Sequence, residues 1–226
     1  MHEQAIAILG GTGDQGLGLA LRFAAAGRRI FIGSRVLERA VAAAEQVREA
    51  VSGADVTGLL NPDASGRAPV VILSVPFEHT AGTVKQIKGS LVAGQIVVSM
   101  AVPLATAIGD GAARTVGVWQ GSCAELVAAL LPPGVEVVSA FQNVSAHRLQ
   151  HLAESVDCDV VVSGGSEPRK LVMGLCSLVP GLRAVDGGPL SNARIVEQLT
   201  ALMIGLNVRY KVREGTGIRF TGLPER

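Results

Sequence analysis

Short runs of apolar residues alternate with longer segments of helical periodicity along the first part of the chain. The short runs are continuous and rich in β-branched residues, which indicates strands that are buried on both faces. The predicted strands are 5–9, 29–33, 56–60, 69–75, 95–100 and 135–141. The predicted helices between them are 15–26, 36–51, 78–87 and 122–131. This alternation predicts an α/β fold, a doubly wound parallel sheet covered by helices on both faces.

The regular alternation of predicted strands and helices changes after residue 141. A β-branched run predicts a strand at 159–163, and helices are predicted at 167–178 and at 191–206, with a strand or turn at 182–188. We therefore predict two domains. Residues 1–141 would form the first domain, and residues 142–226 would form a small C-terminal α+β domain.

The composition is that of a soluble globular protein. Of the 226 residues, 48% are apolar and 17% are charged, which is enough for a buried core. The net charge of +1 and the dispersed basic residues do not favour nucleic acid or an anionic membrane as a partner. With no membrane-spanning apolar run and no signal-like start, we expect a cytoplasmic protein.

The cysteines and histidines do not form a metal-binding pattern. Cys123, Cys158 and Cys176 have no Cys-x-x-Cys spacing and are expected to be reduced thiols in the core or in helices. His147 and His151 have helical i, i+4 spacing without a His-Glu-x-x-His frame. We therefore expect a half-exposed helix pair here and no metal site.

The stretch LGGTGDQGLG contains a candidate nucleotide-binding loop. Gly11, Gly13 and Gly16 match the pattern G-x-G-x-x-G between the first predicted strand and the first predicted helix. In this motif the first glycine permits a tight turn, the second admits a pyrophosphate, and the third allows close packing of the helix. Thr12 adds a hydroxyl donor. The loop predicts a Rossmann-like fold for the first domain and a bound dinucleotide.

The end of the second strand favours NADP over NAD. NAD sites usually place an acidic residue there for the ribose 2′-hydroxyl. This chain has Ser34 and Arg35 instead, and Arg39 follows one helical turn later. A hydroxyl and two guanidinium groups suit a phosphate dianion. The alternative interpretation is that both arginines are simply solvated.

The carboxyl ends of the next two strands should face the same ligand, as in other open parallel sheets. Ser74, Pro76 and His79 follow one strand, and the sequence SMAVP (99–103) follows the next. His79 would contact a phosphate or ribose, or alternatively cap its helix. The predicted cofactor-binding residues are Gly11, Thr12, Gly13, Asp14, Gln15, Gly16, Ser34, Arg35, Arg39, Ser74, Val75, Pro76, His79, Ala101 and Val102.

Four stretches together resemble the NADPH-dependent reductases of the deazaflavin coenzyme F420. They are ILGGTGDQGLGLALRFA, GSR, SVPFEH and GGPLSNARIVEQLT, and the resemblance extends to GTGIRF near the C-terminus. It implies an oxidoreductase, usually a homodimer, with NADP as cofactor and coenzyme F420 as co-substrate. The implied reaction is reversible hydride transfer between C4 of NADPH and C5 of the 8-hydroxy-5-deazaflavin.

The same resemblance implies that the deazaflavin binds in a cleft between the two domains, which residues 142–226 complete. Its motifs assign residues 139–146 and 189–194 to the deazaflavin side of the cleft. The predicted substrate-binding residues are Gln142, Asn143, Val144, Ser145, Leu190, Ser191 and Asn192. Trp119 and Phe141 are the few candidates for an aromatic wall of the deazaflavin site. For Trp119 we favour a role in packing over a role in this wall. Because such a pocket would release its ligand, we expect no permanently bound flavin.

The chain departs from the family at one point. Archaeal members have His-Thr-Ile-Pro where this chain has Gln142 followed by Asn143, Val144 and Ser145. Gln142 cannot titrate near neutral pH as a histidine does. We predict no acid–base or nucleophilic catalyst, since proximity of the two cofactor rings carries most of such a reaction. Backbone N–H groups of Asn143, Val144, Ser145 and Ala146 would position the deazaflavin and stabilise charge on it.

Two other functions stay open from the sequence. One is an NADP-dependent reductase of a small imine or carbonyl substrate, similar to pyrroline-carboxylate reductases. Those proteins usually have a longer helical C-terminal domain, whereas the segment after Ser191 offers one long helix. The other is an NADP-binding sensor without turnover.

Overall fold

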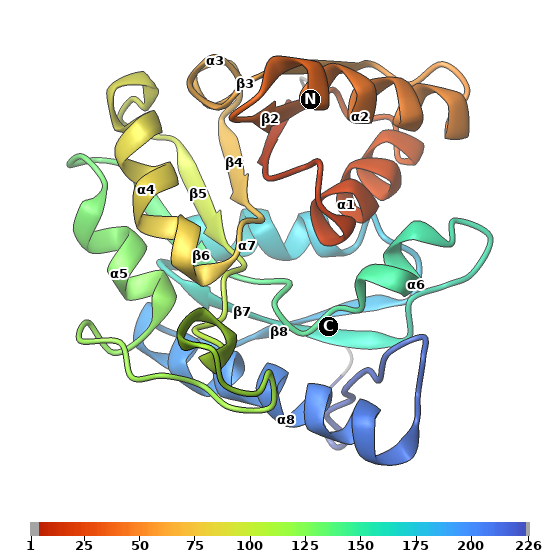
Figure 1. The fold of residues 1–226 in the computed structure, drawn as a ribbon, viewed down its shortest axis with the longest axis vertical. Helices are drawn as coiled ribbons and strands as arrows, with labels where there is room; N and C mark the ends of the chain where they lie inside the picture. Colours follow the sequence, from red (N-terminus) through yellow and green to blue (C-terminus); the bar gives the residue numbers. More distant parts are fainter. Residues whose placement is uncertain (1–4, 225–226) are drawn as a thin grey trace.

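The computed structural model describes residues 5–224 of the chain (Figure 1). Its strands are β1 (Ile6–Leu9), β2 (Ile30–Ser34), β3 (Val56–Leu60), β4 (Val70–Leu73), β5 (Ile96–Ser99), β6 (Glu136–Ser139), β7 (Cys158–Gly164) and β8 (Leu182–Asp186). Its α-helices are α1 (Asp14–Ala25), α2 (Leu37–Ala50), α3 (Asn61–Ser65), α4 (Phe77–Ile87), α5 (Cys123–Leu130), α6 (Ala146–Gln150), α7 (Ser166–Cys176) and α8 (Ala193–Tyr210). Short 3-10 turns lie at Lys88–Ser90, Ala105–Ile108 and Leu190–Asn192.

All eight strands form one sheet in the order β3-β2-β1-β4-β5-β6-β7-β8. Strands β1 to β6 are parallel, and the order reverses direction at β1, where β2 lies on one side and β4 on the other. The predicted α/β fold is confirmed, since this is the Rossmann order with two added strands. Strand β7 runs antiparallel to β6, and β8 runs parallel to β7.

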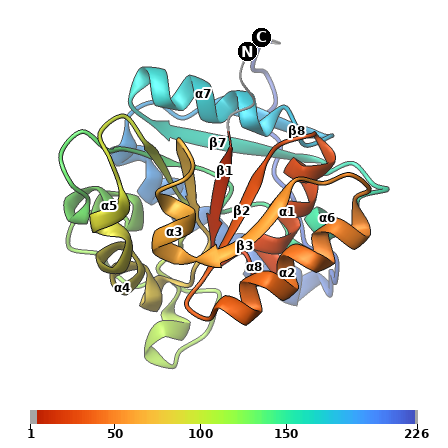
Figure 2. The same cartoon turned by 90° about the horizontal axis from the view of Figure 1, so that it is seen from above.

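Helices cover both faces of the sheet (Figure 2). Alternate strand residues point to opposite faces, so Ile6 and Ile8 pack with α1, α2 and α7, while Ala7 and Leu9 pack with α3, α4 and α5. Both faces of β1 are fully buried, which explains why its sequence is continuously apolar. The three cysteines are buried free thiols, as the sequence predicts.

The sheet continues across the predicted domain boundary. Strand β6 ends at Ser139, and β7 then pairs with it through Val138 and Ser139. The second half of the chain therefore extends the sheet of the first half, and the division at residue 141 stays a prediction. Within residues 5–224, no helix is both long and apolar enough to span a membrane.

The sequence pattern does not predict helices α3 and α6, which the structure contains. Each has only five residues, too few for an amphipathic pattern to be read. A capping signal for α6 is present, because Ser145 accepts the backbone N–H of Arg148. Helix α8 also extends beyond its prediction, to Tyr210, and its predicted first residues form a 3-10 turn.

Candidate active site

Two cavities meet at the carboxyl edge of the parallel strands. The first, the arginine cavity, has a volume of about 300 Å³ and lies where β1, β2 and β4 end. The second, the central cavity, has a volume of about 490 Å³ and lies where β1, β4 and β5 end, bounded by α8. Gly13, Ser74, Val75 and Pro76 line both cavities. The two cavities therefore form one groove across the point where the strand order reverses.

The glycine loop forms the floor of this groove between β1 and α1. Gly10 has φ +80, and its backbone passes so close to Ser74 that no side chain would fit there. The tight turn predicted for Gly11 therefore falls on Gly10, because Gly10 is the residue in the left-handed conformation. Gly11 is packed instead, since a Cβ there would lie 3.0 Å from Ile32 and from the carbonyl of Ile8.

Gly16 and Gly13 are needed for different reasons. A Cβ at Gly16 would lie 2.6 Å from the carbonyl oxygen of Gly10, so Gly16 allows α1 to start against the loop. A Cβ at Gly13 would meet only the Gly10 carbonyl at 3.5 Å, an ordinary contact, and the backbone of Gly13 is extended. No described residue crowds the position of a Cβ at Gly13, so the absence of a side chain leaves open space into which a ligand can approach the backbone.

The start of α1 suits an anion. Its N-cap, Gly13, provides no side chain to bind the first N–H groups of the helix. Those groups have no partners inside the helix, and the helix dipole adds positive potential at this end. The groove therefore presents an uncapped helix N-terminus beside the open space at Gly13, which fits a pyrophosphate.

The arginine cavity carries the positive charge of the groove. Arg35 and Arg39 both line it and are solvent-exposed, and neither makes an ion pair with another residue in 5–224. Ser34 is buried beside them, and its hydroxyl accepts the backbone N–H of Val36. His79 lines the same cavity and is exposed. Two unpaired guanidinium groups beside a hydroxyl form a donor set that fits a phosphate dianion.

The structure brings most of the predicted cofactor residues together. All of them line one or both cavities except Gly11 and Gly16, which are buried beneath the loop. Asp14, Gln15, Ala101 and Val102 line the central cavity. The central cavity is also lined by residues from the stretches SVPFEH, SMAVP and GGPLSNARIVEQLT, namely Phe77, Glu78, Met100 and Thr200. Residues outside the stretches that the sequence singled out complete it: Leu104, Thr106 and Ile204.

The predicted deazaflavin residues are placed differently. Gln142 lines the central cavity, is only 4% exposed, and donates from Nε2 to the hydroxyl of Ser139, while its Oε1 has no partner among the described residues. Val144 donates its backbone N–H to Phe141, so that group is already engaged. The predicted residues that line neither cavity are Asn143, Val144, Ser145, Leu190, Ser191 and Asn192.

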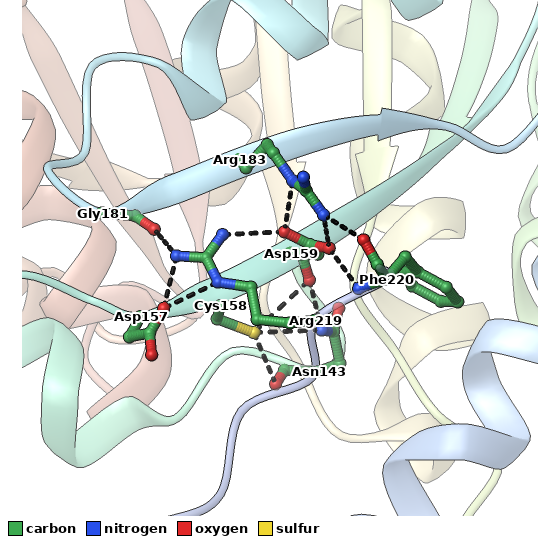
Figure 3. Close-up of polar contacts among 8 residues, drawn as sticks. All are labelled: Asn143, Asp157, Cys158, Asp159, Gly181, Arg183, Arg219 and Phe220. Carbon is green, nitrogen blue, oxygen red and sulfur yellow. Dashed lines mark hydrogen bonds and ion pairs between the residues drawn. The ribbon is translucent and has the colours of Figure 1, made fainter. Parts of the chain in front are cut away.

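Asn143 belongs to a polar cluster around the buried Asp159 (Figure 3). Its amide donates to the carbonyl oxygen of Asp159 at 2.7 Å and to the sulfur of Cys158 at 3.3 Å. The Asp159 carboxylate is fully buried and accepts hydrogen bonds from Arg183, Arg219 and the backbone of Phe220. The cluster fixes the C-terminal segment against β7.

The aromatic candidates also differ from expectation. Trp119 is 98% exposed, so the prediction that it packs is wrong. Phe141 is fully buried, and its ring meets that of Phe23 edge-on at 6.2 Å, so it packs against α1 and lines neither cavity. His147 and His151 stack on one another at 4.2 Å. Among residues 5–224, no group of three or more metal-ligating side chains gathers.

The fold and the groove define a dinucleotide-binding protein of the Rossmann class. The family described as "NADP oxidoreductase coenzyme F420-dependent" matches residues 5–103. The F420-dependent NADP reductase of Methanocaldococcus jannaschii is 50% identical to the chain, over 96% of the chain and 98% of that protein. The chain belongs to the family of F420-dependent NADP reductases, which confirms the resemblance seen in the sequence.

Two further comparisons agree with this assignment. The F420-dependent NADP reductase of Methanothermobacter thermautotrophicus (strain Delta H) is 44% identical, over 97% of the chain and 96% of that protein. The crystal structure of a candidate F420-dependent NADP reductase from Arthrobacter sp. FB24 matches with a TM-score of 0.78, covering 96% of the chain and all of that protein. At 24% identity this last likeness concerns the fold alone.

Proposed function

We propose that the protein transfers a hydride reversibly between NADPH and coenzyme F420 in the groove formed by the two cavities. NADPH supplies the hydride from C4 of its nicotinamide, and the deazaflavin accepts it at C5. The observation that carries this proposal is the continuity of the groove, from the two unpaired arginines to the central cavity. The nicotinamide of a dinucleotide and an acceptor ring can therefore meet within one space.

Each part of the chain has a separate task in this proposal. The start of α1 binds the pyrophosphate, and Arg35 and Arg39 bind the 2′-phosphate that distinguishes NADP from NAD. The walls of the central cavity hold the two reacting rings together and exclude water, with Gln142 at its inner side. No side chain is required to transfer a proton to the reacting carbons.

We propose a cellular location, a set of partners and an oligomeric state together with this function. We place the protein in the cytoplasm, without nucleic acid as a partner. We propose a homodimer, for which the exposed apolar residues of α8 offer a surface: Ile195 is 54% exposed and Leu202, two turns later, is 57% exposed. The alternative reductase of an imine or carbonyl substrate is not favoured, because the full-length relatives are named for coenzyme F420.

The origin of the transferred hydrogen tests the proposal. NADPH deuterated at the transferable C4 position is incubated with the protein and oxidised coenzyme F420, and the reduced deazaflavin is analysed by mass spectrometry. Deuterium at C5 of the product is the expected result, since the hydride passes directly between the two rings. Reduced product without deuterium would contradict direct transfer.

A further inference from the structure

Helix α1 is attached along its whole length to residues 141–152, the segment that carries Gln142. The attachment includes side-chain hydrogen bonds in both directions and a close approach of two helices. Gly13, the N-cap of α1, lines both cavities, and Asp14 and Gln15 line the central cavity together with Gln142. One helix therefore contacts both halves of the groove.

At the start of α1, Gln15 holds the turn that follows β6. Its Nε2 donates to the carbonyl oxygen of Phe141 at 3.0 Å and to that of Val144 at 3.2 Å. An amide nitrogen has two hydrogens, so both donors of Gln15 are used within the protein. In return, Nε2 of Gln150 donates to the carbonyl oxygen of Asp14 at 2.8 Å.

The turn held by Gln15 has an unfavourable backbone. Phe141 has φ +67, a left-handed conformation that bulky residues rarely adopt. Such strain persists only where the surroundings enforce it, and it concentrates at functional sites. Here the Phe141 ring packs against Phe23 of α1, and the Phe141 carbonyl is bound by Gln15. The reversal places the next residue, Gln142, at the wall of the central cavity.

The far end of α1 is fixed by a buried arginine. Arg22 is 3% exposed and donates to the carbonyl oxygens of Arg148, Leu149 and His151 at 2.7, 2.8 and 2.6 Å. These carbonyls lie at the end of α6, where a helix leaves its acceptors unpaired. A Cβ at Gly18 would lie 2.6 Å from that of Leu149, so the two helices touch. Arg22 thus binds the end of α6 to α1.

We propose that Gln15 is a positioning residue, which holds the strained turn 141–144 and thereby sets the place of Gln142 relative to the dinucleotide. This inference rests on the proposed function and adds a specific prediction to it. Both donors of Gln15 are engaged by the turn, so its main effect falls on the acceptor side of the groove. Loss of Gln15 should weaken use of the deazaflavin while leaving NADPH binding nearly intact.

The test uses Gln15→Met, which keeps the length of the side chain and removes its donors. Gln46→Met is the matched control, because Gln46 is exposed on α2 away from both cavities. We expect kcat/KM for coenzyme F420 to fall roughly tenfold, the scale of losing two partly buried hydrogen bonds. The dissociation constant of NADPH, measured without deazaflavin, should change less than about twofold. Both N–H donors of the Gln15 side chain bind the turn, so the substitution removes no donor that is available to NADPH. Gln46→Met should match the wild type in kcat/KM for coenzyme F420 and in the dissociation constant of NADPH.

A second readout does not depend on catalysis. Amide hydrogen exchange of peptides covering 141–150 should be faster in Gln15→Met than in wild type, and faster still in Gln15→Glu, whose carboxylate faces two carbonyl oxygens. Unchanged exchange in both variants overturns the proposal, as does a parallel loss of NADPH affinity and deazaflavin turnover. If the wild type transfers no hydride, the proposed function fails, while the exchange data still decide the role of Gln15.

Discussion

The carboxylate of Glu197, in α8, accepts the backbone N–H groups of Cys123 at 2.9 Å and of Ala124 at 3.1 Å. Those groups are the first two of α5, so Glu197 acts as a cap supplied by another helix. Glu197 is only 1% exposed. Thr200, one turn further along α8, lines the central cavity. This contact therefore fixes the distance between α5 and the part of α8 that closes the groove.

The burial of Glu197 predicts a pH dependence of stability. Burial raises its pKa from 4.5 to about 7, although the two backbone N–H groups act in the opposite direction. The folded state then binds the proton of Glu197 more tightly than the unfolded state does. The contribution of this proton to the free energy of unfolding is therefore complete below pH 4.5 and is lost as the pH rises through 7. The loss is on the order of 3 kcal/mol, since one pKa unit corresponds to about 1.4 kcal/mol.

Urea unfolding between pH 4.5 and pH 8 measures this effect. Glu197→Gln should unfold with a midpoint that changes less over this interval than that of the wild type. Glu45→Gln, which alters an exposed carboxylate on α2, serves as the control and should retain the wild-type slope. Equal slopes in wild type and Glu197→Gln would show that Glu197 does not titrate in this range.

The arginine cavity predicts a preference for NADPH that two substitutions reduce. Arg35→Ala and Arg39→Ala each remove one cation of the proposed phosphate site, and we expect KM for NADPH to rise roughly tenfold or more, as for loss of a charge-assisted hydrogen bond. KM for NADH, which has no 2′-phosphate, should change little. Arg67→Ala, an exposed arginine outside both cavities, is the matched control. Equal increases for both nucleotides would contradict the assignment.

Gln142 tests whether a side chain takes part in the chemistry. It lines the central cavity, and its Oε1 has no partner among the described residues. Gln142→Ala should lower kcat by less than about tenfold, because it removes one polar contact and no proton donor. Single-turnover rates with saturating NADPH and coenzyme F420 measure this directly. A fall to background would assign Gln142 a chemical role.

The cluster at Asp159 predicts a strong effect on stability. Burial opposes ionisation of Asp159, but hydrogen bonds from Arg183, Phe220 and Arg219 outweigh it and lower its pKa to about 2. The contribution of the ionised Asp159 to the free energy of unfolding is therefore complete above pH 3.8 and is lost as the pH falls toward 2. Asp159→Asn should reduce the free energy of unfolding at pH 7 by about 3 kcal/mol, because two arginines lose their shared partner.

The same variant should show a weaker acid dependence below pH 4. Denaturant unfolding at pH 7 and thermal unfolding at acidic pH measure the two effects. Asp55→Asn is a suitable comparison, since Asp55 forms an exposed ion pair with Arg29 and such pairs contribute little. If Asp159→Asn destabilises no more than Asp55→Asn, the cluster does not hold the C-terminal segment as described.

The glycine loop and the strand ends could be predicted because their chemistry is local in sequence. A turn between a buried strand and a helix, with glycines at fixed spacing, has few structural meanings. The parallel strands bring Ser34, Ser74 and Ala101 to one edge by topology alone, and all three line the groove. Predicting the strands was therefore sufficient to predict this half of the site.

The rest of the site depends on packing between distant segments. Thr200 and Ile204 reach the central cavity only because α8 crosses the end of the sheet, which no local pattern in α8 reveals. Asn143 was expected at the ligand, but its amide is bound to the carbonyl of buried Asp159. A polar residue in a predicted binding stretch can thus serve the core, and the sequence alone does not distinguish the two.

The measurement that tests the central claim most directly is an absorbance assay with purified protein, NADPH and oxidised coenzyme F420. The proposal predicts loss of the deazaflavin band with NADPH. It predicts a much slower loss with NADH and no bleaching of FMN in a parallel reaction. Persistence of the deazaflavin band, in a preparation shown to bind NADPH, would contradict the proposed hydride transfer between the two coenzymes.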